Sequence, residues 1–215
     1  GDMEELMVYA ALEDAGEMTL RVYVPYHIKP ETTEEMVKQE AAEMAKVQGD
    51  FARGGAAKFF MDGVWESYTA LNVEPYADVP EANPDGIYSL EHFTRMAELC
   101  DKMGLQIFVH CCGDGAVRRT LDGYEAVQKK NGKRDSRHRV EHIEVYRPDD
   151  LPRFNQLGVL PSMQTSHAPF SVAEGDVWPT RVGEQRWPLS FAWRDIKNAG
   201  NNIAFGSDWP VAPYD

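Results

Sequence analysis

Four side chains that can bind a metal or carry a proton lie in, or at the ends of, short strand-like runs. Lys58 lies within AAKFFMDG, His110 ends LQIFVH, His142 lies near the end of HRVEHIE, and Asp208 ends NIAFGSD. Imidazole and carboxylate groups bind divalent metals, and both groups also transfer protons during hydrolysis. One such histidine alone is more often hydrogen-bonded structure. Four at equivalent places on separate strands indicate one shared site.

Strand alternation predicts which neighbours share a face with His110. Successive side chains of a strand point to opposite faces, so Phe108 and Cys112 have the same parity as His110. Cys112 can therefore either reach a metal held by His110 or fill space as a small buried residue.

The same rule makes predictions for the strand that carries His142. Val140 shares its parity, whereas Glu141 is expected to face the surrounding helices. His138 precedes His142 by four residues, roughly 13 Å along a strand, so it is expected to be structural.

Helix-like and strand-like segments alternate along the chain. Ser89 is the expected N-cap of one helix, which ends at Gly104. Nearly continuous apolar strands separated by helices predict a parallel α/β sheet, either open or closed into a barrel. The segment CGDGA does not fit the GxGxxG pattern, so a dinucleotide-binding fold is unsupported. The Pro- and Asp-rich stretch 64–88 is too long for a simple connection and is expected to be either functional or a covering loop.

Composition excludes several function classes. The chain has 215 residues and a formal net charge of −13, which is unfavourable for binding a nucleic acid backbone. No apolar run approaches the ~20 residues that a membrane-spanning helix needs. The three cysteines are odd in number and form no CxxC pair, which favours a reducing compartment, and we expect a cytoplasmic location.

Several segments resemble those of one enzyme superfamily. They are KFFMDGVWESYTALNVEPYAD, HCCGDGAV, RHRVEHIE, LGVLPSMQTSHA and AFGSDWPVAP. In this order they resemble the amidohydrolase superfamily, within it the amidohydrolase-3 branch of N-substituted formamide deformylases and exoenzyme regulatory proteins. The resemblance implies a distorted TIM-like (β/α)8 barrel with a small β-sandwich. It also implies a metal site with an HxH motif on strand 1, an often carboxylated lysine on strand 4, histidines on strands 5 and 6, and an aspartate on strand 8.

The matching metal ligands are Lys58, His110, His142 and Asp208, but the HxH motif is missing. None of the six histidines are two residues apart. The simplest interpretation is that residues 1–215 form a single incomplete α/β barrel domain, about strands 3–8, from a longer amidohydrolase, without the β-sandwich. The unpaired edges of such a barrel are expected to promote a homo-oligomer.

The resemblance implies a metal-dependent hydrolase that acts on carbon–nitrogen bonds of a small amide-type substrate. The expected cofactor is one or two divalent ions, zinc first, with Asp208 as the catalytic proton carrier. Without HxH we expect weak or absent metal binding and no useful turnover by this chain alone. The residues expected near the substrate are His167, Asp62, Trp65, Glu66 and Tyr76. His167 could instead cap a loop, and the whole chain could be a non-catalytic regulatory or binding protein on the same scaffold.

Overall fold

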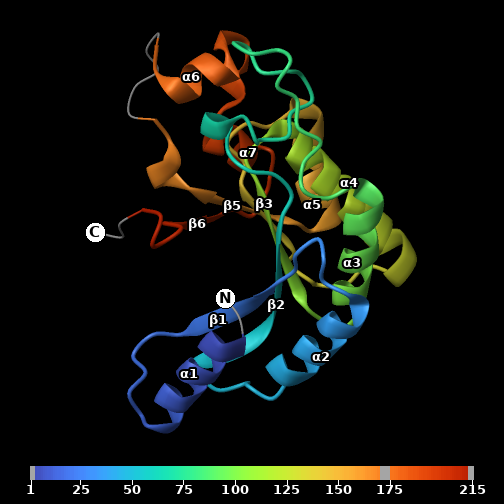
Figure 1. The fold of residues 1–215 in the computed structure, drawn as a ribbon, viewed down its shortest axis with the longest axis vertical. Coiled ribbons are helices and arrows are strands. Elements are labelled where there is room, and N and C mark those ends of the chain that lie inside the picture. The colour runs from blue at the N-terminus through green and yellow to red at the C-terminus, as the bar shows by residue number, and fades with distance from the viewer. Residues whose placement is uncertain (1–2, 170–174, 213–215) are drawn as a thin grey trace.

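The computed structural model describes residues 3–169 and 175–212, and a single parallel sheet runs through these residues. Its strands are paired in chain order from β1 to β6. They are β1 (Val22–His27), β2 (Ala52–Phe60), β3 (Gln106–Cys111), β4 (Arg139–His142), β5 (Leu160–Gln164) and β6 (Ala204–Gly206). The sheet curls from β1 to β6, and most of the helices lie on its outer side (Figure 1). This confirms the prediction of a partial TIM-like barrel.

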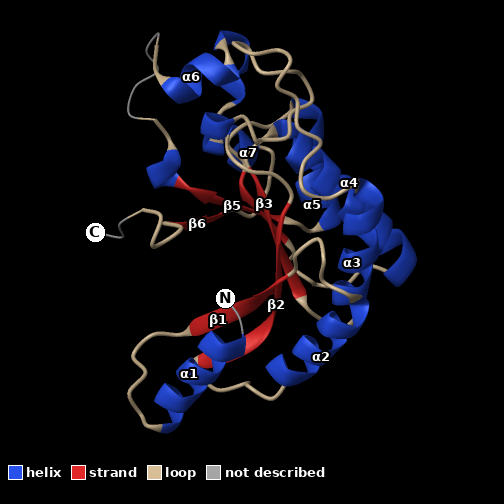
Figure 2. Cartoon of the chain, in the orientation of Figure 1, coloured by secondary structure: helices blue, strands red, loops and turns tan. Residues whose placement is uncertain are grey.

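The connections between strands carry helices, as the alternation in the sequence predicts. The α-helices are α1 (Met3–Asp14), α2 (Glu34–Met44), α3 (Leu90–Lys102), α4 (Asp114–Asn131), α5 (Leu151–Leu157), α6 (Val177–Val182) and α7 (Trp193–Asn198). Short 3-10 helices occupy Trp65–Ser67, Pro148–Asp150, Thr165–His167 and Glu184–Leu189. Figure 2 shows the strands inside and the helices around them. Parallel strands joined by crossover helices place all their carboxyl ends at one edge, which is where sites form.

Local sequence signals explain where α3 begins and ends. The Ser89 hydroxyl oxygen accepts a hydrogen bond from the backbone N–H of His92 at 3.2 Å, so Ser89 is the predicted N-cap. The helix ends at Lys102, and Gly104 follows with a φ of 81°, a conformation that favours glycine. These two signals set where α3 begins and ends.

The two outer strands of the half-barrel have no partner on one side among the described residues. They are β1 and β6, because the strand order begins with one and ends with the other. The β1 edge contains Pro25, where the register to β2 also shifts. Proline and irregular pairing are features that reduce edge-to-edge association. The β6 edge is only three residues long.

Two clusters of buried side chains hold the structure together. The larger one lies between the sheet and its helices and includes Phe59, Ile107 and Val140. The second one packs beneath the long segment 64–88 and includes Trp65, Tyr76 and Trp178. The segment is therefore an ordered cover with its own apolar core, in agreement with its predicted role. Within the residues described, no helix has the length and apolar character that crossing a membrane requires.

Candidate functional site

The centre of the site is a pair of histidines on adjacent strands. Register pairs Phe60 of β2 with His110 of β3, and Cys111 of β3 with His142 of β4. The two histidines are therefore diagonal neighbours at the carboxyl ends of their strands. Their ring centroids lie 4.3 Å apart with an edge-to-face geometry. The structure thus brings these two residues together from different strands.

The strand alternation predicted for β4 is wrong for both Val140 and Glu141. Glu141 does not face the helices, but lines the inside of the half-barrel and forms an ion pair with Arg139 at 2.7 Å. Val140 packs in the outer core. His142 has a φ of 73°, so the extended geometry on which alternation depends ends at this residue. The positive φ turns His142 to the site on the side that Glu141 also faces.

His167 and Asp208 complete the cluster from the other side. The His167 ring stacks on that of His142, with centroids 5.5 Å apart and an interplanar angle of 12°. Its Nε2 atom lies 3.8 Å from Oδ2 of Asp208, which follows β6. The sequence left His167 open between a residue of the site and a loop cap. Its stacking places it within the cluster.

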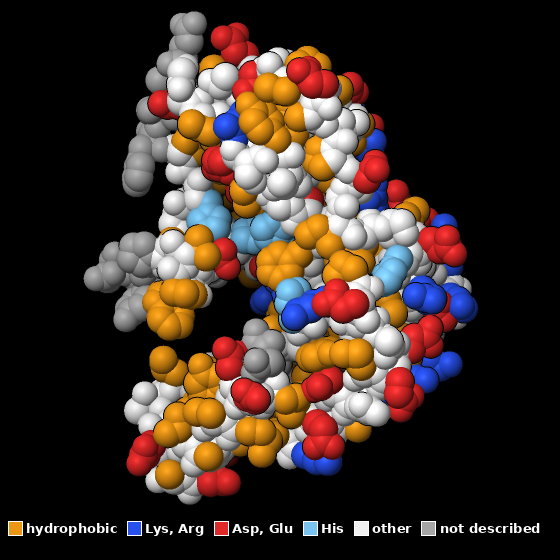
Figure 3. Space-filling view, viewed as in Figure 1, with side chains coloured by type: hydrophobic (Ala, Val, Ile, Leu, Met, Phe, Trp, Pro, Cys, Tyr) orange, Lys and Arg blue, Asp and Glu red, His pale blue; other side chains and the backbone are white. Residues whose placement is uncertain are grey.

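A cavity of about 520 Å³ opens over these side chains. Its lining residues are Lys58, Phe60, Val64, Glu66, His110, Cys112, His142, Glu144, His167, Asp208 and Val211. A second hollow of about 500 Å³ shares Lys58, Phe60, His142 and Asp208 with it and extends toward β1. Figure 3 shows this face hollowed, with histidine side chains at the wall. All four predicted metal-ligand residues therefore border one continuous depression.

The residues predicted from the long loop do not share one role. Glu66 lines the cavity, but Trp65 and Tyr76 are 0% and 1% exposed and belong to the second buried cluster. The Trp65 indole N–H donates to the carbonyl of Cys112 at 3.2 Å. Trp65 and Tyr76 thus lie behind the cavity wall and support it, because their aromatic rings form the buried core beneath the loop.

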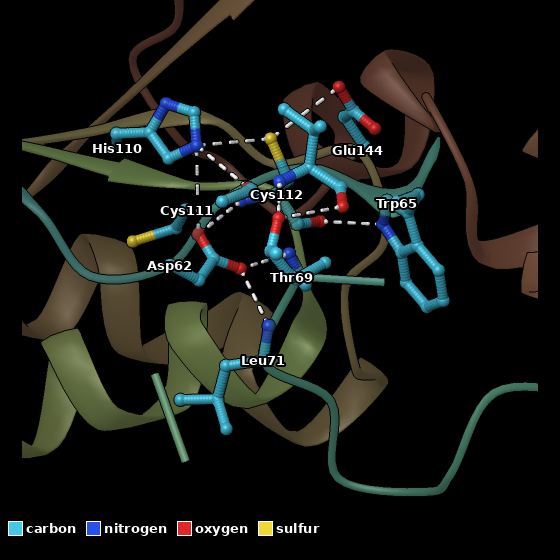
Figure 4. Close-up of polar contacts among 12 residues, drawn as sticks. Asp62, Trp65, Thr69, Leu71, His110, Cys111, Cys112 and Glu144 are labelled. Carbon is cyan, nitrogen blue, oxygen red and sulfur yellow. Dashed lines mark hydrogen bonds and ion pairs between the residues drawn. The ribbon is translucent and has the colours of Figure 1, made fainter. Parts of the chain in front are cut away.

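Asp62 lies behind His110 and joins the loop to the end of β3. Its carboxylate accepts hydrogen bonds from the backbone N–H groups of Leu71, Cys112 and Gly113 at 2.9, 3.0 and 2.8 Å. Its Oδ1 also lies 3.7 Å from Nε2 of His110 (Figure 4). Burial raises the pKa of Asp62 to about 8, and the three donors oppose that shift. Asp62 does not line the cavity, so direct substrate contact is not its role in this geometry.

Glu144 is a cavity residue that the sequence did not single out. It lies two residues after His142 and is 6% exposed. The Trp178 indole N–H donates to its Oε2 at 2.9 Å, and the Cys112 thiol lies 3.6 Å from its Oε1. Burial raises its pKa to about 7. An acid two residues after a strand-end histidine, and thus of the same parity, was the available signal.

Burial sets the charge state of the basic groups. The pKa of His110 is lowered to about 4 and that of His142 to about 2, mainly by desolvation. Both are thus neutral near pH 7, which is the form of imidazole that binds metals. The pKa of Lys58 is also lowered, again first by desolvation.

The donor atoms fit a divalent cation. His110, Cys112 and His142 each offer a ligand atom within 4.8 Å of the others, and so do His142, His167 and Asp208. The buried Nδ1 of His142 and Nε2 of His167 have no hydrogen-bond partner in the described structure. Buried polar atoms normally have one, so these atoms are suited to receive a ligand. His138, in contrast, accepts from the N–H of Ile107 at 3.0 Å and lies outside the site, as predicted.

The fold and the cluster define a class of protein. An open parallel half-barrel that carries histidines and an aspartate at its strand ends is the scaffold of TIM-like metal-dependent hydrolases. The chain belongs to the Amidohydrolase family, whose sequence model matches residues 1–215.

Three curated proteins are similar to this chain. The chain is 31% identical over 212 residues to Protein LONG AFTER FAR-RED 3 of Arabidopsis thaliana, covering 98% of this chain and 35% of that protein. It is 31% identical over 174 residues to the putative amidohydrolase YtcJ of Bacillus subtilis, covering 80% and 32% of the two chains. An N-substituted formamide deformylase of Arthrobacter pascens is 26% identical over 164 residues, with 75% and 29% covered.

A solved structure gives the same result. An uncharacterized metal-dependent hydrolase from Pyrococcus furiosus superposes with a TM-score of 0.78 at 25% identity, over 98% of this chain and 41% of that chain. The chain spans about a third of the length of the curated relatives that it matches.

Proposed function

We propose that the chain carries the metal-binding and proton-transfer residues of a hydrolase that cleaves carbon–nitrogen bonds in small amide-type molecules. The observation that supports this most is the convergence of His110, His142, His167 and Asp208 on one cavity. The names of two relatives, an amidohydrolase and a formamide deformylase, support the choice of bond.

The ligands of a divalent metal, zinc first, are proposed to be His110, His142, Asp208 and a carboxylated Lys58. When bound, the metal supplies Lewis-acid chemistry, which polarises the scissile carbonyl and makes water acidic enough to attack near neutral pH. The two histidines are kept neutral by burial, which leaves a lone pair on each ring. The lowered pKa of Lys58 favours its neutral amine, the form that reacts with carbon dioxide to give a carbamate.

Proton transfer is assigned to Asp208. Its carboxylate lies at the cavity, 3.8 Å from Nε2 of His167. It takes the proton of the attacking water and delivers it to the leaving nitrogen, so that an amine departs instead of an unstable amide anion. The ring of His167 stacks on that of His142, and in this position His167 orients Asp208.

Substrate contact is assigned to the open part of the cavity wall. Glu66 and His167 lie there, on the loop after β2 and after β5. A cavity of about 520 Å³ suits a small molecule and not a polymer segment buried along its length. We therefore propose a small amide, formamide, urea or cyclic amide as the substrate class.

Hydrolysis measurements test the proposal. The protein to be assayed is the longest product of the reading frame that contains this chain, loaded with zinc or cobalt. It is incubated with N-formyl amines, simple carboxamides and cyclic amides, and the release of amine is measured. Asp208→Asn should abolish turnover while leaving the fold intact, and Asp78→Asn on the outer loop is the matched control. Metal-independent turnover, or full activity of the Asp208 variant, would overturn the proposal.

The 215-residue chain alone is expected to bind metal weakly and to show no useful turnover, because no HxH motif is present in it. The alternative, a non-catalytic binding protein on this scaffold, predicts that amides or amines bind to the longest product without being cleaved. Calorimetry on the same compounds separates the two possibilities.

A further inference from the structure

The sulfur of Cys112 lies at the edge of the histidine pair. Cys112 directly follows β3, whose last residue is Cys111, and it lines the cavity together with His110 and His142. Its Sγ atom is 3.4 Å from Nε2 of His110. Cys112 is 1% exposed, so its sulfur is part of the cavity wall and is shielded from bulk solvent.

We propose that Cys112 is a protein ligand of the metal, which His110, Cys112 and His142 hold together. This inference rests on the proposed function, since it concerns the same metal. One ligand atom from each residue lies within 4.8 Å of the others. Ligand atoms around a tetrahedral zinc are roughly 3.3–3.8 Å apart, as bond lengths near 2.0–2.3 Å require. The sulfur and Nε2 of His110 are already at such a separation.

An independent feature of His142 supports this arrangement. His142 is 6% exposed, and its Nδ1 atom has no hydrogen-bond partner in the described structure. A buried nitrogen without a partner is costly in a protein, and a metal ion would remove that cost. His110, Cys112 and His142 all belong to this chain, so this set of three ligands does not require an HxH motif.

Binding changes protons at two atoms. The S–H bond of Cys112 breaks as the metal–sulfur bond forms, and the proton leaves to solvent in the cavity. Nε2 of His110 now lies 2.9 Å from the carbonyl oxygen of Gly63, which can only accept. The imidazole therefore moves its proton to Nδ1 when Nε2 takes the metal, and its net charge stays the same.

His110, Cys112 and His142 would leave one position of a tetrahedral metal open toward the cavity, which Lys58 and Asp208 also line. A thiolate is a soft ligand, so the site should prefer zinc, cobalt or cadmium to magnesium or manganese. This preference separates the set of three ligands from a site made only of oxygen and nitrogen ligands.

Absorption spectroscopy of the 215-residue chain tests the inference. Cobalt(II) and cadmium(II) are titrated separately without oxygen and with a phosphine reductant, and the sulfur-to-metal charge-transfer band in the ultraviolet is followed. The wild-type chain should show the band, and Cys112→Ser and Cys112→Ala should lose it. The metal dissociation constant of both variants should rise by at least about tenfold.

The double variant Cys100→Ser/Cys111→Ser is the matched control, because Cys112 is then the one remaining cysteine of three. The Cys111 thiol lies 3.2 Å from the Thr120 hydroxyl in the core, away from the cavity. This variant should keep the band, which assigns it to Cys112 even if the Cys112 variants fail to fold.

Two results would overturn the inference. One is cobalt binding to the wild-type chain without a sulfur band, which would leave the proposed hydrolase intact with other ligands. The other is no binding of either metal to this chain. The hydrolase is judged separately, by amide cleavage in the longest product, so the two proposals can fail independently.

Discussion

The rings of His110 and His142 lie 4.3 Å apart although the two residues are 32 positions apart and belong to different strands. Parallel pairing of β3 with β4 creates this proximity, and the positive φ of His142 completes it. Two imidazolium rings at this distance would repel each other, which together with burial disfavours protonation of the pair and leaves nitrogen lone pairs for a metal ion. The first prediction follows from this relationship.

His142→Asn should weaken metal binding by the chain by at least about tenfold, because asparagine offers no imidazole lone pair. His138→Asn is the matched control on the same segment. His138 accepts from the N–H of Ile107 and pairs with Asp101, so its replacement should cost about 1–3 kcal/mol of unfolding free energy without changing the metal dissociation constant. Calorimetric titration with zinc and chemical denaturation measure the two quantities. Equal metal affinity in wild type and His142→Asn would contradict the assignment.

The sequence predicted much of this arrangement, and the reasons are physical. Strand-end side chains of a parallel sheet meet at one edge, so Lys58, His110, His142 and Asp208 could be grouped without a structure. The helix limits near Ser89 and Gly104 were also readable, because caps have local signals.

Other parts could not be predicted, because they depend on backbone angles and on packing between distant segments. Val140 and Glu141 lie on the faces opposite to those expected, because the extended geometry of β4 ends at His142. The burial of Trp65 depends on contact with Trp178, more than 100 residues away, which local patterns do not encode.

Glu144→Gln should make the protein more stable than the wild type as the pH rises. Burial raises the folded pKa of Glu144 to about 7, whereas an unfolded glutamate titrates near about 4.3. The protonated acid therefore favours the folded state fully below about pH 4, and this contribution is lost as the pH rises toward 7. Glutamine stays neutral and keeps an oxygen for the Trp178 indole.

Urea denaturation of the metal-free protein from pH 4.5 to 8 measures this effect. The difference in unfolding free energy should move in favour of Glu144→Gln by about 1–3 kcal/mol over that range. Glu66→Gln, at the exposed rim of the same cavity, is the control and should show little change. A difference that does not vary with pH would mean that Glu144 is ionised at no cost.

Asp62→Asn should loosen the loop that covers the site. The carboxylate accepts three backbone N–H groups from Leu71, Cys112 and Gly113, and an amide cannot accept all three without turning its own N–H₂ toward a donor. We expect a loss of about 2–4 kcal/mol in unfolding free energy. Asp78→Asn, whose carboxylate accepts from Tyr68 at the surface, should change it by less than about 0.5 kcal/mol. Amide hydrogen exchange should then be faster at Leu71 than at Ile107 in the β3 core.

Self-association should depend on the β1 edge. We expect the chain to form homo-oligomers through the open edges of the half-barrel, and Pro25 limits pairing at β1 because it has no N–H to donate. Pro25→Val supplies a donor and a β-branched side chain, so it should strengthen association, whereas Arg95→Val on α3, an exposed position on a helix that packs against α4 and β3, should not. Sedimentation velocity over a hundredfold range of concentration measures the effect. If the wild type and Pro25→Val sediment alike as monomers throughout that range, the edges of this sheet do not drive assembly.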